Sequence, residues 1–383
     1  MSIGSLSRTG LAIAVVTASA TSFAAPVTAD PGETSTWLTG RTADVRCAGV
    51  PGAGEAGSFR HLASRIIAGL GDPHHRGFDL VAPASAEAQT IEGWISYSVA
   101  AKALEDEDVD VFACRQGAWA KLGRTRTDGE GHFALALTTA RRLPVAMRDL
   151  YVSVVGDRTG AAFLAYVAPD DAPLIVSDVD GTLTSSENAF LTSLAFGGPP
   201  AARAGAAAMY TAAARRGYQL IYVTARGNQY TSQTRQWLAA NGFPRGPVRL
   251  SPSFITLPGD ATATYKTTTL TALADGLTIV LGIGNRASDI TAYADAGLAA
   301  EHIFVELPEY EAELAGPLAA GDARGFGSYD DLAATTLAVL PGTLRTAPPR
   351  HAPDLVSLAS TRSRRASSRQ HLQTRSPGSS RDP

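Results

Sequence analysis

A short apolar run that leads directly into an Asp-x-Asp-Gly-Thr motif constrains this 383-residue chain more than any other feature. Residues 174–177 have the length and composition of a buried strand, and Asp178 and Asp180 follow it two positions apart. Two carboxylates just past a strand end project into one crevice while the backbone turns, and Gly181 permits that turn at little steric cost. One carboxylate can attack phosphorus, the other can move a proton, and both can hold a divalent cation.

Around this motif, residues 171–343 alternate between strand-like and helix-like patterns. Alternation of this kind predicts an α/β domain with a parallel sheet and crossover helices, wound like a Rossmann sheet. Five strands are expected, at residues 174–177, 219–223, 248–250, 278–283 and 302–307. Helices are expected at residues 201–216, 229–240, 266–274 and 289–296. Ligands of such sheets bind at the carboxyl ends of the strands, so the chemistry is expected there.

Residues 30–170, which precede this domain, have a different sequence pattern. Residues 85–170 carry short strand patterns separated by turn residues, which predicts an all-β sandwich of immunoglobulin-like or transthyretin-like type. A half-buried strand is expected at residues 108–114 and a hairpin turn at residues 128–131. Residues 30–84 are expected to be partly helical, with one helix at residues 59–70 that stops at a Gly-Asp-Pro sequence.

Both ends of the chain have distinctive compositions. Residues 1–29 combine Arg8, a short apolar run and small-x-small cleavage sites, which predicts a signal peptide and a secreted or periplasmic protein. In such an oxidising compartment Cys47 and Cys114, the only two cysteines, are expected to form a disulfide; two buried thiols are the alternative. Residues 344–383 are rich in Ser, Pro and Arg and are expected to be disordered. This basic tail either contacts an anionic membrane or cell-wall polymer or is an inert solvated segment. The net charge of −3 says little about partners, and no nucleic-acid partner is expected.

Further polar residues stand at the other predicted strand ends. Thr224-Ala225-Arg226 ends the second strand, and Asn285 and Asp289 follow the fourth. Lys266 opens the predicted helix after the third strand, and it is the only lysine in this part of the chain. A phosphoryl-transfer site needs a nucleophile, a proton shuttle, phosphate donors and a cation. All four can be supplied by these residues.

The order of these motifs resembles that of the haloacid dehalogenase (HAD) phosphatase superfamily. Within it, the sequence is most similar to the catalytic region of lipins, the magnesium-dependent phosphatidate phosphatases. That region (LNS2) is shared with certain phosphatidylinositol transfer proteins. The likeness covers roughly residues 174–310, and its most specific part is the run Phe-Pro-Arg-Gly-Pro-Val-Arg-Leu-Ser-Pro-Ser at residues 243–253. The N-terminal region of lipins has no counterpart, since a β-rich segment takes its place.

The resemblance implies a role for each matching residue. Asp178 would be the nucleophile that forms an aspartyl-phosphate, and Asp180 the general acid and then base. Lys266 would neutralise charge shared by the nucleophile and the phosphate. The substrate-binding residues would be Thr182, Thr224, Ala225 and Arg226, although Arg226 could equally pair structurally. Mg²⁺ would be held by Asp178, Asp180 through its backbone carbonyl, and Asn285, while Asp289 would support either the metal or Lys266.

We therefore expect a secreted Mg²⁺-dependent phosphomonoesterase that resembles phosphatidate phosphatases. The alternatives are a phosphatase for another extracellular phosphomonoester and a non-catalytic module that binds phosphatidate. The segments before Thr224 and before Lys266 are too short for an independent cap domain, so the site is expected to be open. Residues 197–200, Gly-Gly-Pro-Pro, could form a mobile flap over it.

Overall fold

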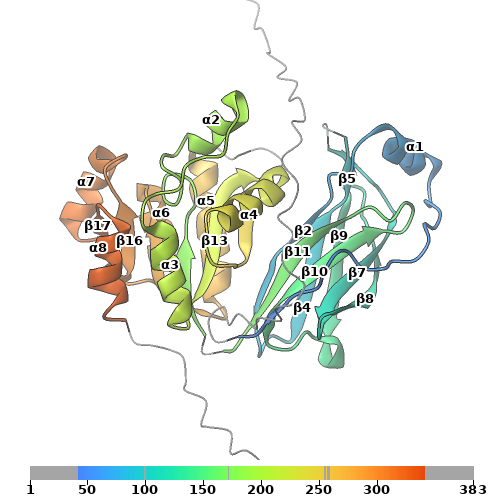
Figure 1. Cartoon of the computed structure of the whole chain (residues 1–383), viewed down its shortest axis with the longest axis horizontal. Coiled ribbons are helices and arrows are strands. Elements are labelled where there is room, and N and C mark those ends of the chain that lie inside the picture. Colours follow the sequence, from blue (N-terminus) through green and yellow to red (C-terminus); the bar gives the residue numbers. More distant parts are fainter. Residues whose placement is uncertain (1–41, 99–100, 171, 254–255, 257–258, 341–383) are drawn as a thin grey trace, which may run out of the picture. The chain divides into compact units, whose positions relative to one another are not determined.

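The computed structural model describes residues 42–98, 101–170, 172–253, 256 and 259–340 (Figure 1). The predicted signal peptide at residues 1–29 and the predicted basic tail at residues 344–383 lie outside these described residues. A search of the described helices finds none with the length and apolar character needed to cross a membrane.

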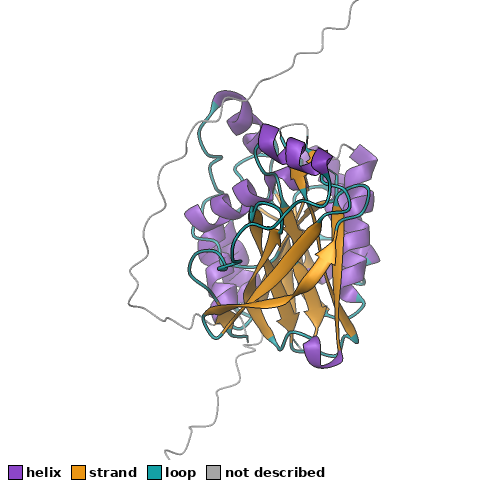
Figure 2. Cartoon of the chain, turned by 90° about the vertical axis from the view of Figure 1, so that its right-hand side faces the viewer, coloured by secondary structure: helices purple, strands orange, loops and turns teal. Residues whose placement is uncertain are grey.

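The part before residue 170 is built mainly from strands, as predicted (Figure 2). One helix, α1 (Leu62–Leu70), precedes most of them and ends before Gly71. The strands are β1 (Asp44–Val45), β2 (Arg76–Phe78), β3 (Leu80–Pro83), β4 (Ala88–Trp94), β5 (Ser96–Tyr97), β6 (Lys102–Ala103), β7 (Asp108–Arg115), β8 (Ala118–Arg126), β9 (His132–Thr138), β10 (Ala146–Val154) and β11 (Gly160–Ala168). The largest sheet has the order β3-β11-β10-β7-β8, with β1 paired to β10. A second sheet has the order β2-β4-β9, and β5 pairs with β6.

The two larger sheets bury one core between them. Alternate side chains of the facing strands enter it, such as Ile91 of β4, Val111 of β7 and Val152 of β10. This packing confirms the predicted β-sandwich, because period-two alternation places one side of each strand in a shared core. The strands begin before residue 85, since β2 and β3 already pair with β4 and β11. The predicted hairpin at residues 128–131 is wrong: a turn is present, but it joins β8 to β9, which lie in different sheets.

The predicted disulfide is present between Cys47 and Cys114, whose Cα atoms lie 5.6 Å apart. It links the segment before α1 to β7 of the largest sheet. The alternative of two buried thiols is therefore excluded.

The second part is an α/β domain with a six-stranded parallel sheet in the order β14-β13-β12-β15-β16-β17. Its strands are β12 (Pro173–Ser177), β13 (Gln219–Gly227), β14 (Val248–Ser251), β15 (Thr278–Gly284), β16 (Ile303–Glu306) and β17 (Arg324–Phe326). Its helices are α2 (Ala189–Phe196), α3 (Ala206–Arg215), α4 (Thr231–Ala240), α5 (Gly259–Ala274), α6 (Ala287–Asp295), α7 (Glu311–Ala320) and α8 (Tyr329–Leu332). The predicted fold class is confirmed, with one strand more than expected. Strand β17 escaped prediction because its three residues, Arg-Gly-Phe, carry no apolar run.

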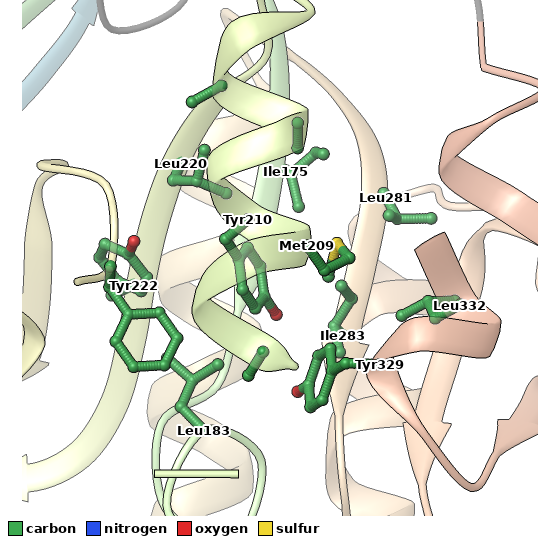
Figure 3. Packing of buried hydrophobic residues seen from close by; sticks show 14 of the residues in the cluster. Ile175, Leu183, Met209, Tyr210, Leu220, Tyr222, Leu281, Ile283, Tyr329 and Leu332 are labelled. Atoms are coloured by element: carbon green, nitrogen blue, oxygen red, sulfur yellow. The ribbon is translucent and has the colours of Figure 1, made fainter. Parts of the chain in front are cut away.

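Alternate residues of the central strands pack against opposite helical layers. Ile175 of β12 faces α3, where Met209 and Tyr210 complete a buried cluster (Figure 3). Its neighbours Leu174 and Val176 belong to the opposite cluster, which contains side chains of α5 and α6. A strand buried on both faces in this way explains why residues 174–177 read as a continuous apolar run.

Several helices differ from the sequence prediction. Helix α5 starts at Gly259, so Lys266 lies in its middle and not at its beginning. Helices α7 and α8 were not predicted, because α7 contains Gly316 and Pro317 and α8 has only four residues. Helix α2 was not predicted either, because its apolar residues are followed at once by Gly197 and Gly198. These two glycines adopt positive φ angles of 81° and 83°, a region that disfavours other residues.

Candidate active site

The carboxyl ends of β13, β12 and β15 are neighbours in the sheet, and they bring the predicted residues together. Asp178 follows β12, Thr224 lies near the end of β13, and Asn285 follows β15. The register of β13 against β14 is irregular between Thr224 and Gly227. A cavity of about 100 Å³ opens here, lined by Asp178, Asp180, Glu187, Asn188, Phe190, Leu191, Thr224, Ala225, Arg226, Thr256, Thr262 and Lys266.

Asp178 and Lys266 form the centre of this cavity. The Lys266 ammonium lies 2.6 Å from Asp178 Oδ1 and 2.6 Å from Asp289 Oδ1, and all three residues are buried. Burial raises the pKa of Asp178, and the charges of Asp289 and Glu187 raise it further, while Lys266 opposes this shift. The two carboxylates raise the pKa of Lys266, so this lysine stays cationic despite its burial. One buried cation thus serves two carboxylates, and negative charge is left in excess.

The backbone turn after Asp178 depends on glycine. Gly181 has a φ angle of +71°, and its N–H donates to Thr184 Oγ1 over 2.9 Å. A β-carbon at Gly181 would lie 2.0 Å from Asn285 Nδ2, so no larger residue fits without displacing that amide. Thr182 Oγ1 donates to Asp178 Oδ2 over 3.1 Å. The motif therefore positions its own first carboxylate.

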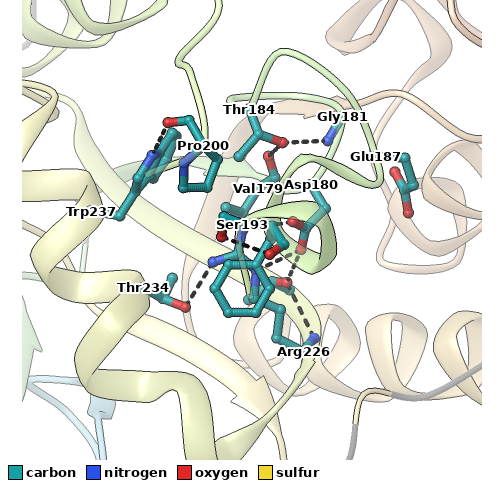
Figure 4. Close-up of polar contacts among 12 residues, drawn as sticks. Val179, Asp180, Gly181, Thr184, Glu187, Ser193, Pro200, Arg226, Thr234 and Trp237 are labelled. Carbon is teal, nitrogen blue, oxygen red and sulfur yellow. Dashed lines mark hydrogen bonds and ion pairs between the residues drawn. The ribbon is translucent and has the colours of Figure 1, made fainter. Parts of the chain in front are cut away.

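The second carboxylate, Asp180, is held by a buried arginine (Figure 4). Arg226 Nη2 lies 2.6 Å from Asp180 Oδ1, and Arg226 Nε lies 2.8 Å from Asp180 Oδ2. Thr224 Oγ1 donates to the same Oδ2 over 3.0 Å. Of the two roles left open for Arg226, this geometry favours structural pairing. The guanidinium also lies under the ring of Phe190 in α2, with Cζ 3.7 Å from the ring centroid.

Two acidic side chains, Asp289 and Glu187, accept hydrogen bonds from Asn285. Asp289 Oδ2 accepts the backbone N–H groups of Asn285 and Arg286 over 3.0 and 3.1 Å, while its Oδ1 accepts from Lys266. This arrangement suits support of Lys266 better than metal binding. Glu187 Oε2 accepts Asn285 Nδ2 over 3.0 Å. Sequence reasoning missed Glu187 and Phe190; the one signal for Glu187 was an acidic residue shortly after the Asp-x-Asp-Gly-Thr motif.

The residues around Asp178 fit a hard divalent cation. Glu187 accepts the hydrogen bond of the Asn285 amide nitrogen. The other atom of that amide, Asn285 Oδ1, is a buried acceptor without a hydrogen-bond partner among the described residues. Carboxylates also outnumber cationic side chains here by four to two: Asp178, Asp180, Glu187 and Asp289 against Lys266 and Arg226. Oxygen donors with excess negative charge suit Mg²⁺. The described residues contain no cluster of three or more His, Cys, Asp or Glu side chains arranged for a metal, so any such site would rely on amide and backbone oxygens as well.

Comparison with known proteins identifies the two parts of the chain. Residues 175–306 match the family described as "PITM 1-3, LNS2 domain", and residues 73–167 match "PITM 1-3, beta-sandwich domain". The α/β part is therefore similar to an LNS2 domain, as the motifs suggested. The matched families are those of the transfer proteins, the second group that the sequence resembles.

Similar full-length proteins are much longer than this chain. It is 26% identical over 236 residues to the mouse protein "Membrane-associated phosphatidylinositol transfer protein 3", covering 61% of this chain and 23% of that one. It is 26% identical to the Drosophila melanogaster "Protein retinal degeneration B", covering 61% of this chain and 18% of that one. A solved structure, D,D-heptose 1,7-bisphosphate phosphatase from B. bronchiseptica with magnesium and phosphate, shares 16% identity, with coverage of 43% and 98% and a TM-score of 0.34.

These relatives overturn one prediction. A secreted or periplasmic location was expected from residues 1–29, but the relatives are named as membrane-associated phosphatidylinositol transfer proteins. The prediction rested on a short apolar run of small residues in a chain that is rich in alanine throughout. Such a run is a weak signal, because overall composition alone can produce it.

Proposed function

We propose that this site hydrolyses phosphomonoesters through an aspartyl-phosphate on Asp178, and that its substrate is phosphatidate or a related phosphorylated lipid. The observation that carries the proposal is the buried contact of 2.6 Å between Asp178 Oδ1 and the Lys266 ammonium. A nucleophilic carboxylate that approaches an anionic phosphate needs an adjacent fixed cation. The names of the relatives, which are phosphatidylinositol transfer proteins, support a lipid substrate.

In the first step, a carboxylate oxygen of Asp178 attacks phosphorus, and the bond between phosphorus and the ester oxygen breaks. The leaving alkoxide takes a proton from Asp180. Lys266 and Thr182 hold the two oxygens of Asp178 and keep the nucleophile oriented. Thr224 and the backbone N–H of Ala225 would donate to the phosphoryl oxygens. When bound, Mg²⁺ would offset the repulsion between the anionic nucleophile and the anionic phosphate, held by Asp178 and Asn285 with the Asp180 carbonyl.

In the second step, Asp180 accepts a proton from water, which attacks the aspartyl-phosphate. Inorganic phosphate leaves, and the Asp178 carboxylate is regenerated. Both steps require Asp180 to leave its pairing with Arg226, since a carboxylate that accepts two charge-assisted hydrogen bonds is a poor proton donor. An incoming phosphate would compete with Asp180 for this arginine.

The same pairing favours a second candidate function. A module that binds phosphatidate without turnover would need the cations of the site and would have no use for a free general acid. The clamp of Arg226 on Asp180 suits that alternative, while the intact Asp178–Lys266 pair suits an enzyme.

A phosphate-release assay separates the two functions. The full chain is incubated with vesicles that contain phosphatidate, and separately with soluble phosphomonoesters, in the presence of Mg²⁺ or EDTA. We expect Mg²⁺-dependent release that Asp178→Asn abolishes. Vesicle binding without release from any phosphomonoester would reject the enzyme and support the binding module. Release that persists in EDTA would reject the proposed cation site.

A further inference from the structure

Helix α2 stands beside the cavity and leaves apolar side chains in water. Leu191, Leu194 and Phe196 are 51%, 47% and 86% exposed. Residues 188–200 include no charged residue, although charged residues make up 18% of the chain. Water-facing helices normally present polar residues on their outer side, so an exposed apolar face of this kind is unusual. In Figure 1, α2 projects from the end of the α/β domain at which the cavity lies.

This apolar face is continuous with the cavity that holds the phosphate-binding residues. Leu191 lines the cavity together with Asp178 and Lys266, and half of its surface is still open to solvent. The adjacent Phe190 is buried and packs on Arg226 and edge-to-face on Tyr230, with ring centroids 5.0 Å apart. One side of α2 therefore packs at the rim of the cavity, and its other side is exposed to solvent.

The chain around α2 allows the helix to meet a surface without disturbing the sheet. Gly197 and Gly198 follow it with positive φ angles, and the chain is secured again where Trp237 Nε1 donates to the Pro200 carbonyl over 2.7 Å. The flap predicted at residues 197–200 lies in this return segment, directly after α2, and its mobility stays a prediction.

From this juxtaposition we propose that the outer face of α2 inserts into a lipid bilayer and brings the cavity to phosphomonoester headgroups in that surface. The inference rests on the proposed function for the identity of the headgroup. A phosphorylated lipid keeps its acyl chains in the hydrocarbon layer and its phosphate just above them. A cavity that contains Lys266 and Arg226 and is bordered on the α2 side by apolar, uncharged residues matches that arrangement. Contiguous exposed apolar side chains of this kind are typical of surfaces that contact a membrane.

The test measures vesicle binding separately from turnover. Asp178→Asn serves as the background in the binding arm, so that phosphatidate is not consumed. The double variant Leu194→Ser/Phe196→Ser changes exposed residues that do not line the cavity. The matched control is Leu62→Ser/Leu70→Ser, which removes side chains on α1 that are 67% and 83% exposed. Thermal unfolding of each variant shows whether it is folded.

We expect the α2 variant to lose about 10-fold or more in partitioning to phosphatidylcholine vesicles that contain phosphatidate, because two large apolar side chains no longer enter the bilayer. In the wild-type background, its hydrolysis of soluble p-nitrophenyl phosphate should be unchanged. The α1 variant should partition like the parent. Unchanged partitioning of a folded α2 variant, or an equal loss in both variants, would overturn the inference. If no substrate released phosphate, only the proposed hydrolytic activity would be refuted. The vesicle-binding measurement would still test whether α2 inserts into the bilayer.

Discussion

Replacing Lys266 by methionine tests the electrostatic centre of the site most directly. The substitution keeps most of the volume of the side chain and removes the cation that lies 2.6 Å from both Asp178 and Asp289. Breaking a buried ion pair by removing one partner costs about 3–5 kcal/mol, since the other charge is left uncompensated. Here two carboxylates lose their partner, so we expect the upper part of that range in the free energy of unfolding.

The cost should depend on pH with a definite sign. Burial already raises the pKa of Asp178, and Lys266 is the group that lowers it, so the variant should have a still higher pKa. A carboxyl whose folded pKa lies above its unfolded value binds its proton preferentially in the folded state, and its contribution to stability is lost as pH rises. Because burial already raises the pKa of Asp178 to about 8 in the parent chain, both proteins hold this proton at lower pH. The additional loss of the variant should therefore be constant below about pH 7 and grow as the pH rises above about 8.

Urea unfolding at two values, about pH 6 and about pH 9, measures this difference. The control is Lys121→Met, because Lys121 also lies 2.7 Å from an aspartate, Asp110, but is 44% exposed. An ion pair with one partner in solvent contributes at most about 1 kcal/mol, so this variant should lose little at either pH. Equal losses for Lys266→Met at the two pH values, or a loss no greater than that of Lys121→Met, would refute the electrostatic reasoning.

Three further predictions concern single residues. Asp178→Asn should raise the activation barrier of phosphate release by several kcal/mol, on the order of 1,000-fold or more in rate; near-normal release would remove Asp178 as the nucleophile. Gly181→Ala should lower the melting temperature more than Gly242→Ala, which also has a positive φ angle but has nothing within 4 Å of its added carbon; equal effects would show that the Asn285 amide yields freely. Burial lowers the pKa of His75 to about 4, so stability should be full above about pH 6.5 and fall by about 3 kcal/mol towards pH 4; His75→Gln should flatten that slope, and an unchanged slope would place the titration elsewhere.

The sequence alone predicted the features that depend on residues close together along the chain. The apolar run at residues 174–177 and the motif after it determine a buried strand, a glycine turn and two carboxylates at one strand end. Period-two alternation and helical spacing identified both domain types, because backbone geometry imposes those repeats locally. The extra strand β17 and the helices α2 and α8 were missed, since each is too short for its pattern to stand out, and α7 was missed because it contains a glycine and a proline.

Only the tertiary structure decided how the strand ends are paired. From the sequence, Arg226 could bind either substrate or a carboxylate. The pairing of β12 with β13 places it against Asp180, forty-six residues away in sequence. Glu187 is ninety-eight residues from Asn285, and no local pattern connects them. Hydrogen bonds and ion pairs of this range depend on which side chains meet once the core has formed, so spacing along the chain cannot specify them. The sequence thus determined the chemical groups of the site, and the fold determined which of them are engaged and which, like Asn285 Oδ1, are left to meet a ligand.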